Sequence, residues 1–194
     1  MANVVLTGTL AAIPRSDLTQ ESLAKYVVPW EALRIFDAYA TDLTGTASSD
    51  DLGLIGGTFA SASPMVKTST PSGTSITQKT RFCVQLPPEY VSAARVKLRV
   101  HARVEVAANV SATVDFSAYE SNKEGGISAD LVTTAATSIN AITWADVDFE
   151  ITATSLVAGD VLDVQMTLAI NDTGATNAAL GNIGSIELLC DIKG

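Results

Sequence analysis

The stretch RVKLRVHARVEV, residues 95–106, decides the fold class of this chain. Apolar side chains occupy every even position, and charged or titratable side chains occupy every odd position. A β-strand places successive side chains on opposite faces, so this alternation is typical of a half-buried strand. The stretch therefore predicts a β-strand with one apolar face and one basic face.

Short strand patterns recur along the rest of the chain and are separated by turn signals such as Ala158-Gly159-Asp160. They lie at 55–60, 76–86, 95–106, 110–120, 129–134, 144–152, 160–170 and 183–192. Eight short strands without a long helical pattern predict an all-β antiparallel β-sandwich, with a jelly roll as the first choice. Jelly-roll order places the third strand beside the sixth.

That order brings a basic row next to an acidic row. The basic row is Arg95, Lys97, Arg99, His101 and Arg103, and the acidic row is Asp146, Asp148 and Glu150. Opposite charges on neighbouring strands contribute about 0.2–1 kcal/mol per pair, which helps to fix the register. We expect both rows to form interface contacts, within one subunit or between subunits. A sulfated or sialylated glycan and a solvated outer face are the alternatives for the basic row.

Residues 1–50 read as an N-terminal arm, and residues 51–194 as the sandwich domain. The capping-box spacing of Asp17-Leu18-Thr19-Gln20, followed by Leu23, Tyr26 and Val27, predicts a short helix that Pro29 ends. A second segment, 30–39, has too few apolar neighbours to form its own core. Either it packs on its own domain or it reaches a neighbouring subunit, with contacts from Trp30, Leu33, Ile35 and Phe36. In the second case, removal of residues 1–40 leaves the sandwich folded.

Composition limits the partners and the compartment. Hydrophobic residues make up 47% of the 194 residues and charged residues 17%, which favours surface hidden in a homo-oligomer. A net charge of −9 disfavours nucleic acid and acidic membranes as partners. We expect no secretory signal and no transmembrane helix. Alternation turns Cys83 outward and Cys190 inward, and two free thiols suit a reducing cytoplasm.

No catalytic constellation emerges from the titratable residues, so we expect no enzyme and no cofactor or metal. His101 is the single histidine, and Arg99 and Arg103 on either side disfavour the imidazolium that a general base must form. The triplet Asp172-Thr173-Gly174 matches the aspartic-protease signature, but only 20 residues follow it, and we interpret it as a turn. Carboxylates at period two are spread along a line and do not converge on a metal ion.

Three features resemble bacteriophage virion structural proteins: Leu86-Pro87-Pro88-Glu89-Tyr90 before a long strand, Gly159-Asp160-Val161-Leu162 entering another, and a last strand that runs to the C-terminus. The resemblance is to capsid decoration or cement proteins and to jelly-roll head-surface or fibre proteins. It implies a homo-oligomer, a trimer in the simplest case, that stabilises a capsid or appendage. Its partner is then the major capsid or another virion protein, and its location is the virion, after synthesis in the host cytoplasm.

The rival interpretation is a carbohydrate-binding β-sandwich module that mediates attachment to a glycan surface. Such a module needs exposed aromatic side chains as a sugar platform. Aromatic residues make up only 6% of the chain, so the candidates are few: Tyr90, Tyr119 and Trp144.

Overall fold

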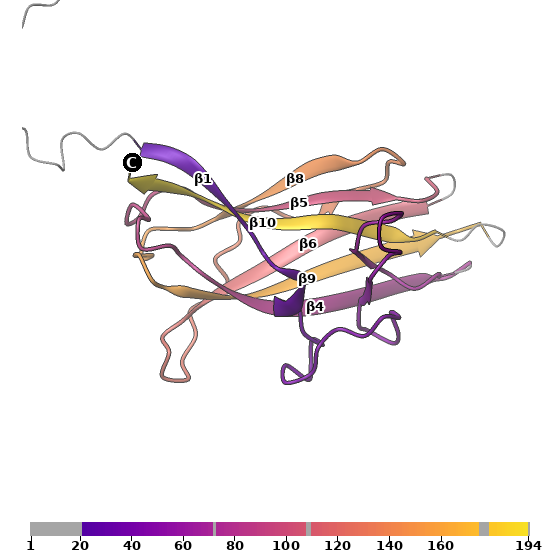
Figure 1. The fold of residues 1–194 in the computed structure, drawn as a ribbon, viewed down its shortest axis with the longest axis horizontal. Coiled ribbons are helices and arrows are strands. Elements are labelled where there is room, and N and C mark those ends of the chain that lie inside the picture. Colours follow the sequence, from indigo (N-terminus) through magenta and orange to yellow (C-terminus); the bar gives the residue numbers. More distant parts are fainter. Residues whose placement is uncertain (1–20, 72, 108–109, 175–178, 194) are drawn as a thin grey trace, which may run out of the picture.

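The computed structural model describes residues 21–71, 73–107, 110–174 and 179–193, and these residues form two stacked antiparallel β-sheets (Figure 1). Sheet A has the strand order β2-β3-β10-β5-β8, and β1 also pairs with β10. Its strands are β1 (Glu21–Val27), β2 (Gly53–Ile55), β3 (Met65–Lys67), β5 (Val96–Val104), β8 (Ala145–Ile151) and β10 (Gly181–Lys193). Sheet B has the order β4-β9-β6-β7, built from β4 (Ser75–Gln85), β6 (Val110–Ser121), β7 (Thr137–Ser138) and β9 (Val161–Asp172).

The prediction of an all-β antiparallel sandwich is confirmed, and the strand order is that of a jelly roll. Strand β5 lies between β10 and β8, so the third predicted strand is beside the sixth, as expected. Lys97 is in register with Glu150, and Arg99 with Asp148. The basic and acidic rows thus lie side by side, as predicted, and the structure adds their register.

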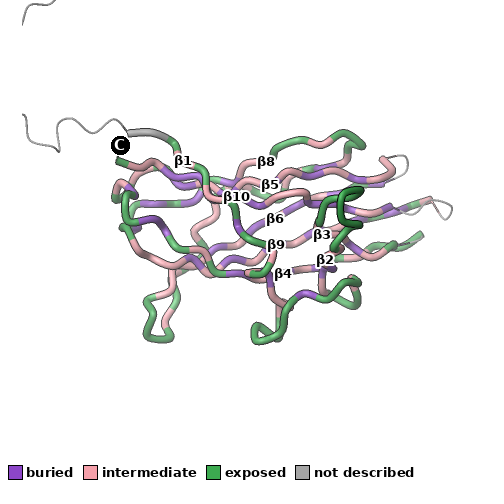
Figure 2. The backbone as a smooth tube through the Cα atoms, in the orientation of Figure 1, coloured by how far each residue is buried: buried purple, intermediate pink, exposed green. Residues whose placement is uncertain are grey.

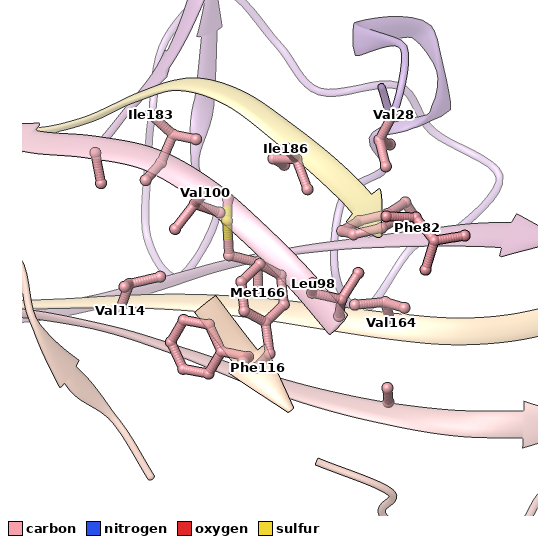
Figure 3. Close-up of a cluster of buried hydrophobic side chains, with 14 of the residues drawn as sticks. Val28, Phe82, Leu98, Val100, Val114, Phe116, Val164, Met166, Ile183 and Ile186 are labelled. Atoms are coloured by element: carbon pink, nitrogen blue, oxygen red, sulfur yellow. The ribbon is translucent and has the colours of Figure 1, made fainter. Parts of the chain in front are cut away.

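The core lies between the two sheets, because each long strand turns one set of alternate side chains inward (Figure 2). In β5 every even residue from Val96 to Val104 is buried, and the inward set predicted for residues 160–170 is buried in β9. Figure 3 shows Val100 of sheet A above Phe116 of sheet B, with Leu98 of sheet A and Met166 of sheet B at intermediate height. Phe116 meets Phe149 edge to face, with ring centroids 5.0 Å apart.

Strand β1 replaces the predicted helix, so that prediction is wrong for residues 21–27. All seven residues pair with β10, from Glu21 opposite Lys193 to Val27 opposite Glu187. A local capping pattern loses here to a long-range sheet pairing, which supplies more backbone hydrogen bonds and burial than one or two helical turns. The capping box itself, residues 17–20, lies outside the described residues. The one helical element in the described ranges is η2 (Trp30–Ala32), a single 3₁₀ turn.

Two short strands also differ from the sequence prediction. Residues 56–60 form a loop, whereas the strands in this region are β2 and β3 on either side of it. Residues 129–134 run beside β8 through isolated backbone contacts, and the strand that pairs with β6 is β7, a few residues later. Alternation over three or four residues does not distinguish such strands from loops. The two cysteines behave as predicted: Cys83 is exposed and Cys190 is buried.

The segment predicted as an arm packs on its own sandwich from residue 21 onward. Leu33 and Leu43 belong to the buried core, and Trp30 and Ile35 pack against it. These contacts match the first of the two alternatives for residues 30–39, packing on the same domain, and contact with a neighbouring subunit stays a prediction. Removal of residues 1–40 would take β1 and Leu33 out of the fold, so a folded sandwich after that truncation is no longer expected. No helix in the part of the chain that the structure describes is long and apolar enough to cross a membrane.

Phe149→Ala tests the core against an exposed control of the same residue type. Phe149 is fully buried, so we expect a loss of about 3–5 kcal/mol in the free energy of unfolding from lost burial and the cavity left behind. Phe59 is 100% exposed, and Phe59→Ala is expected to change stability by less than about 0.5 kcal/mol. Urea unfolding followed by tryptophan fluorescence measures both. Equal effects of the two substitutions would contradict the assigned core.

Candidate functional site

A groove of about 330 Å³ lies on the outer face of sheet B and is the main candidate site in the described residues. Its floor is formed by outward side chains of three adjacent strands: Arg81 of β4, Asp163 and Gln165 of β9, and Tyr119 of β6. Its walls come from Phe36 and Asp37 on one side and Ile127 on the other. Figure 1 shows the two loops that carry these wall residues projecting from the same side of the sandwich.

An ion pair fixes the floor of the groove. Arg81 donates two hydrogen bonds to Asp163, one of them from Nε to Oδ1 at 2.8 Å and the other from Nη2 to Oδ2. This hydrogen bonding raises the pKa of Arg81 further above its ordinary value. A bidentate pair of this kind holds both side chains in one plane. The groove thus has a rigid polar floor.

Tyr39 covers the same arginine from the loop side, with its ring centroid 5.0 Å from the guanidinium carbon. A hydrogen bond with Cys83, together with burial, raises the pKa of Tyr39 to about 12. The hydroxyl is therefore protonated at neutral pH. Next to it, Phe36 lies under the ammonium of Lys79, 4.6 Å from the ring centroid. These cation–π contacts anchor the loop of residues 33–42 to β4.

The groove combines an apolar wall with polar groups that can bind hydroxyls. Phe36, Tyr119 and Ile127 supply the apolar surface. Asp37 supplies a carboxylate. Gln165 donates one of its two amide N–H groups to Thr167 Oγ1 at 2.8 Å, and its amide oxygen is an acceptor group in the groove. One guanidinium faces two carboxylates, so the local charge is negative. His101 lies on the outer face of sheet A, on the other side of the core from this groove.

The predicted basic and acidic rows meet on the outer face of sheet A, within one subunit. Arg99 donates from Nε and Nη2 to the two oxygens of Asp148, at 2.6 and 2.9 Å. Three neighbouring contacts extend the row: Lys97 Nζ to Glu150 Oε1 at 2.5 Å, Arg99 Nη1 to Asp146 Oδ2 at 3.5 Å, and His101 Nδ1 to Asp146 Oδ1 at 2.7 Å. We call this set the charged ladder. Its carboxylates are already paired with Lys97, Arg99 and His101 of the basic row.

Strand β10 adds acidic residues on the other flank of β5, which the sequence analysis missed. Glu187 is opposite Arg99 and accepts a hydrogen bond from Lys25 of β1 at 3.0 Å. Asp191 pairs with Arg95 at 3.1 Å. With Lys25 of β1 and Glu187 of β10 included, the charged ladder crosses four strands, and the sign of the charge alternates from strand to strand. The sequence pattern of residues 183–192 could have predicted this contact, because Glu187 is an acidic residue at an outward position of an otherwise apolar strand.

Arg103 differs from the other members of the basic row because it contacts an aromatic ring. Its guanidinium carbon lies 4.8 Å from the ring centroid of Trp144, and His101 stacks on the same tryptophan with centroids 5.2 Å apart and planes 8° apart. The ring also lies against Gly184, where an added Cβ would come within 3.2 Å of it. Gly184 sits at a register shift in β10 and makes room for the indole. Trp144 is thus packed among three neighbours.

The structure separates the three aromatic candidates for a sugar platform. Tyr90 is 2% exposed and donates its hydroxyl to the carbonyl of Ala94 at 2.7 Å, so it is a core residue. Trp144 is held by His101, Arg103 and Gly184. Tyr119 alone of the three lines the groove. Of the predicted contact residues in the N-terminal segment, Phe36 also lines the groove, whereas Leu33 is 1% exposed and has no surface for a neighbour.

Comparisons with known proteins identify no family for this chain. Neither a protein-family model nor a curated protein matches the chain. The similar solved structures include carbohydrate-binding modules. A xylan-binding module CBM15 is 14% identical, with 87% of this chain and 97% of that chain covered and a TM-score of 0.44. The CBM22-1 xylan-binding domain of Xyn10C from Paenibacillus barcinonensis is 13% identical, with 74% and 82% covered and a TM-score of 0.38. Similarity at this level transfers no ligand.

Asp148 gives the charged ladder a measurable pH dependence. The hydrogen bonds from Arg99 hold the pKa of Asp148 below its ordinary value of 3.8. A carboxyl with a lowered folded-state pKa stabilises the fold above the unfolded-state pKa, and this contribution is lost as the pH falls through the folded-state pKa. We therefore expect the free energy of unfolding to decline below about pH 4 and the decline to be weaker in Asp148→Asn.

Urea unfolding at a series of pH values from 2 to 7 measures this difference, with Glu124→Gln as the control. Glu124 is an exposed carboxyl in the loop after β6, away from the charged ladder. If Asp148→Asn and wild type lose stability in parallel below pH 4, the charged ladder does not contribute to the fold in the way described.

Proposed function

We propose that this chain is a non-catalytic β-sandwich binding module that holds a glycan in the groove on sheet B. The observation that carries the proposal is the placement of Tyr119 beside Arg81, Asp163 and Gln165 on the floor of one groove. A sugar ring has an apolar C–H face and a rim of hydroxyls. It needs an aromatic surface and fixed polar groups at the same place, and this groove offers both.

The size and rigidity of the groove support this function. Its volume of about 330 Å³ falls at the lower end of the range of small-molecule sites. The Arg81–Asp163 pair is preformed, so a ligand does not have to order these side chains on binding. A neutral glycan suits the site best, because Asp37 and Asp163 outnumber Arg81 and the chain carries a net charge of −9. The charged ladder gives no support to a sulfated or sialylated ligand, because its basic residues are already paired.

Tyr119→Ala tests the proposal on a glycan array that contains neutral and anionic oligosaccharides. We expect wild type to bind neutral glycans and Tyr119→Ala to lose at least tenfold in affinity, about 1.4 kcal/mol, because the apolar face of the sugar loses its partner. Trp144→Ala is the matched control: it removes an aromatic side chain from sheet A, and binding is expected to be unchanged. Absence of binding to every glycan, or equal losses in the two variants, would refute the proposal.

Virion assembly is the second candidate function, and the loop between β2 and β3 favours it. Phe59 is 100% exposed at the tip of this loop. The N–H groups of Ser61 and Ala62 donate to the carbonyl of Thr58 at 2.9 and 2.8 Å. Gly57 has φ +69°, and a Cβ there would lie 2.3 Å from the Ala62 carbonyl oxygen, so the loop conformation requires glycine. Aromatic side chains, phenylalanine included, are enriched at protein–protein interfaces, so Phe59 suits such a contact.

Immunogold labelling of virus particles from cells that make this chain tests the assembly function. We expect labelled particles with wild type and at least fivefold less label with Phe59→Ala, since the partner loses its aromatic anchor. Ile142→Ala removes another exposed apolar side chain, 60% exposed, and should not change the labelling. Unlabelled particles with wild type would exclude this candidate.

A further inference from the structure

In the ranges that the structure describes, the edges of the two sheets are protected, with one exception. At the β4 edge, Lys79 donates its N–H to the carbonyl of Asp50, and Leu52 donates to Lys79. At the β8 edge, Thr133 donates to Glu150, and Thr152 donates to Leu131. Strands β2 and β7 are only three and two residues long. Covered or short edges prevent pairing with other chains.

Strand β1 is the exception, because it is seven residues long and, among the described residues, pairs with β10 alone. The backbone N–H of Val28 donates to the carbonyl of Ile186 at 2.9 Å. The backbone N–H and C=O groups of the even-numbered residues in β1 are therefore directed toward β10. In an antiparallel strand, alternate residues direct their backbone groups to opposite sides. The N–H and C=O groups of Leu23, Lys25 and Val27 therefore point to the free edge.

The side chains of the same three residues favour pairing of this edge with another strand. Leu23 is 44% exposed and Val27 is 63% exposed, and both lie on the outer face of sheet A. A lysine in an edge strand usually guards it against pairing. Here the Lys25 ammonium forms an ion pair with Glu187 of β10, 3.0 Å away. Its charge is therefore directed toward β10 and not toward the free edge.

We propose that β1 pairs with β1 of a second copy, antiparallel and about a two-fold axis at Lys25. In that register Leu23 of one copy is opposite Val27 of the other, on both sides of the axis. Lys25 meets its own counterpart, and each ammonium is paired with its own Glu187. Pro29 has no N–H and ends the pairing just after Val27. The two copies of sheet A become one continuous sheet.

A second copy fits this edge because the pattern is self-complementary. An isologous contact requires that residue i meets j while j meets i, and the spacing of Leu23 and Val27 around Lys25 satisfies that condition. Such a contact closes at two subunits, whereas the virion resemblance implies a trimer. The groove on sheet B lies on the other side of the core, so this inference is independent of glycan binding.

Sedimentation equilibrium of the full chain over a concentration series tests the pairing. We expect wild type to reach twice the 20.1 kDa of one chain. The double variant Leu23→Lys/Val27→Lys places lysine opposite lysine across the axis and should weaken the dimer at least a hundredfold. The double variant Leu23→Glu/Val27→Lys places opposite charges across the axis and should restore it.

Ile142→Lys adds charge at an exposed apolar position outside β1 and should leave the dimer intact. Circular dichroism melting checks that each variant is folded, since every substituted side chain is exposed. A wild type that is monomeric at about 1 mM overturns the proposal, as does a dimer that survives Leu23→Lys/Val27→Lys. A charge-swapped variant that stays monomeric overturns the two-fold register.

Discussion

The pairing of β5 with β10 on one side and β8 on the other is the constraint on which the structure depends. It joins the two halves of sheet A, and its alternation divides the molecule into an apolar interior and a charged exterior. A slip of one residue would move Val96, Leu98 and Val100 to the solvent and Arg99 into the core. The charged ladder on the outer face makes the same slip unfavourable as well, because Arg99 would no longer lie opposite Asp148 and Glu187.

This arrangement explains why the two faces of the sandwich differ in what they offer to a ligand. On the outer face of sheet A the charged side chains pair with one another across four strands, and Trp144 packs against Gly184. The outer face of sheet B instead carries one fixed ion pair, Arg81 with Asp163, between two projecting loops. The groove that combines aromatic and polar side chains therefore lies on sheet B.

Long-range alternation was the part of the fold that the sequence predicted well. The strands β4, β5, β6, β9 and β10 each run for nine or more residues, and a period-two pattern of that length excludes a helix. Strand β1 was missed because its seven residues have no pattern of their own and depend on β10 for pairing. The pairing of Arg99 with Asp148 was predictable because both rows lie on alternating strands. The groove was not, since Phe36, Arg81, Tyr119 and Asp163 come from four separate segments that only the folded sheet brings together.

The pairing of β1 with β10 also has a consequence for synthesis on the ribosome. Lys25 and Glu187 are 162 residues apart in the chain. At roughly 5–20 residues per second, β1 emerges about 8–30 seconds before its partner exists. During that interval the first strand of the fold has no sheet to join, and contacts this distant in sequence form slowly even in a finished chain. The closing of sheet A by β1 is therefore expected to be the last step of folding, after the long strands have already collapsed on each other.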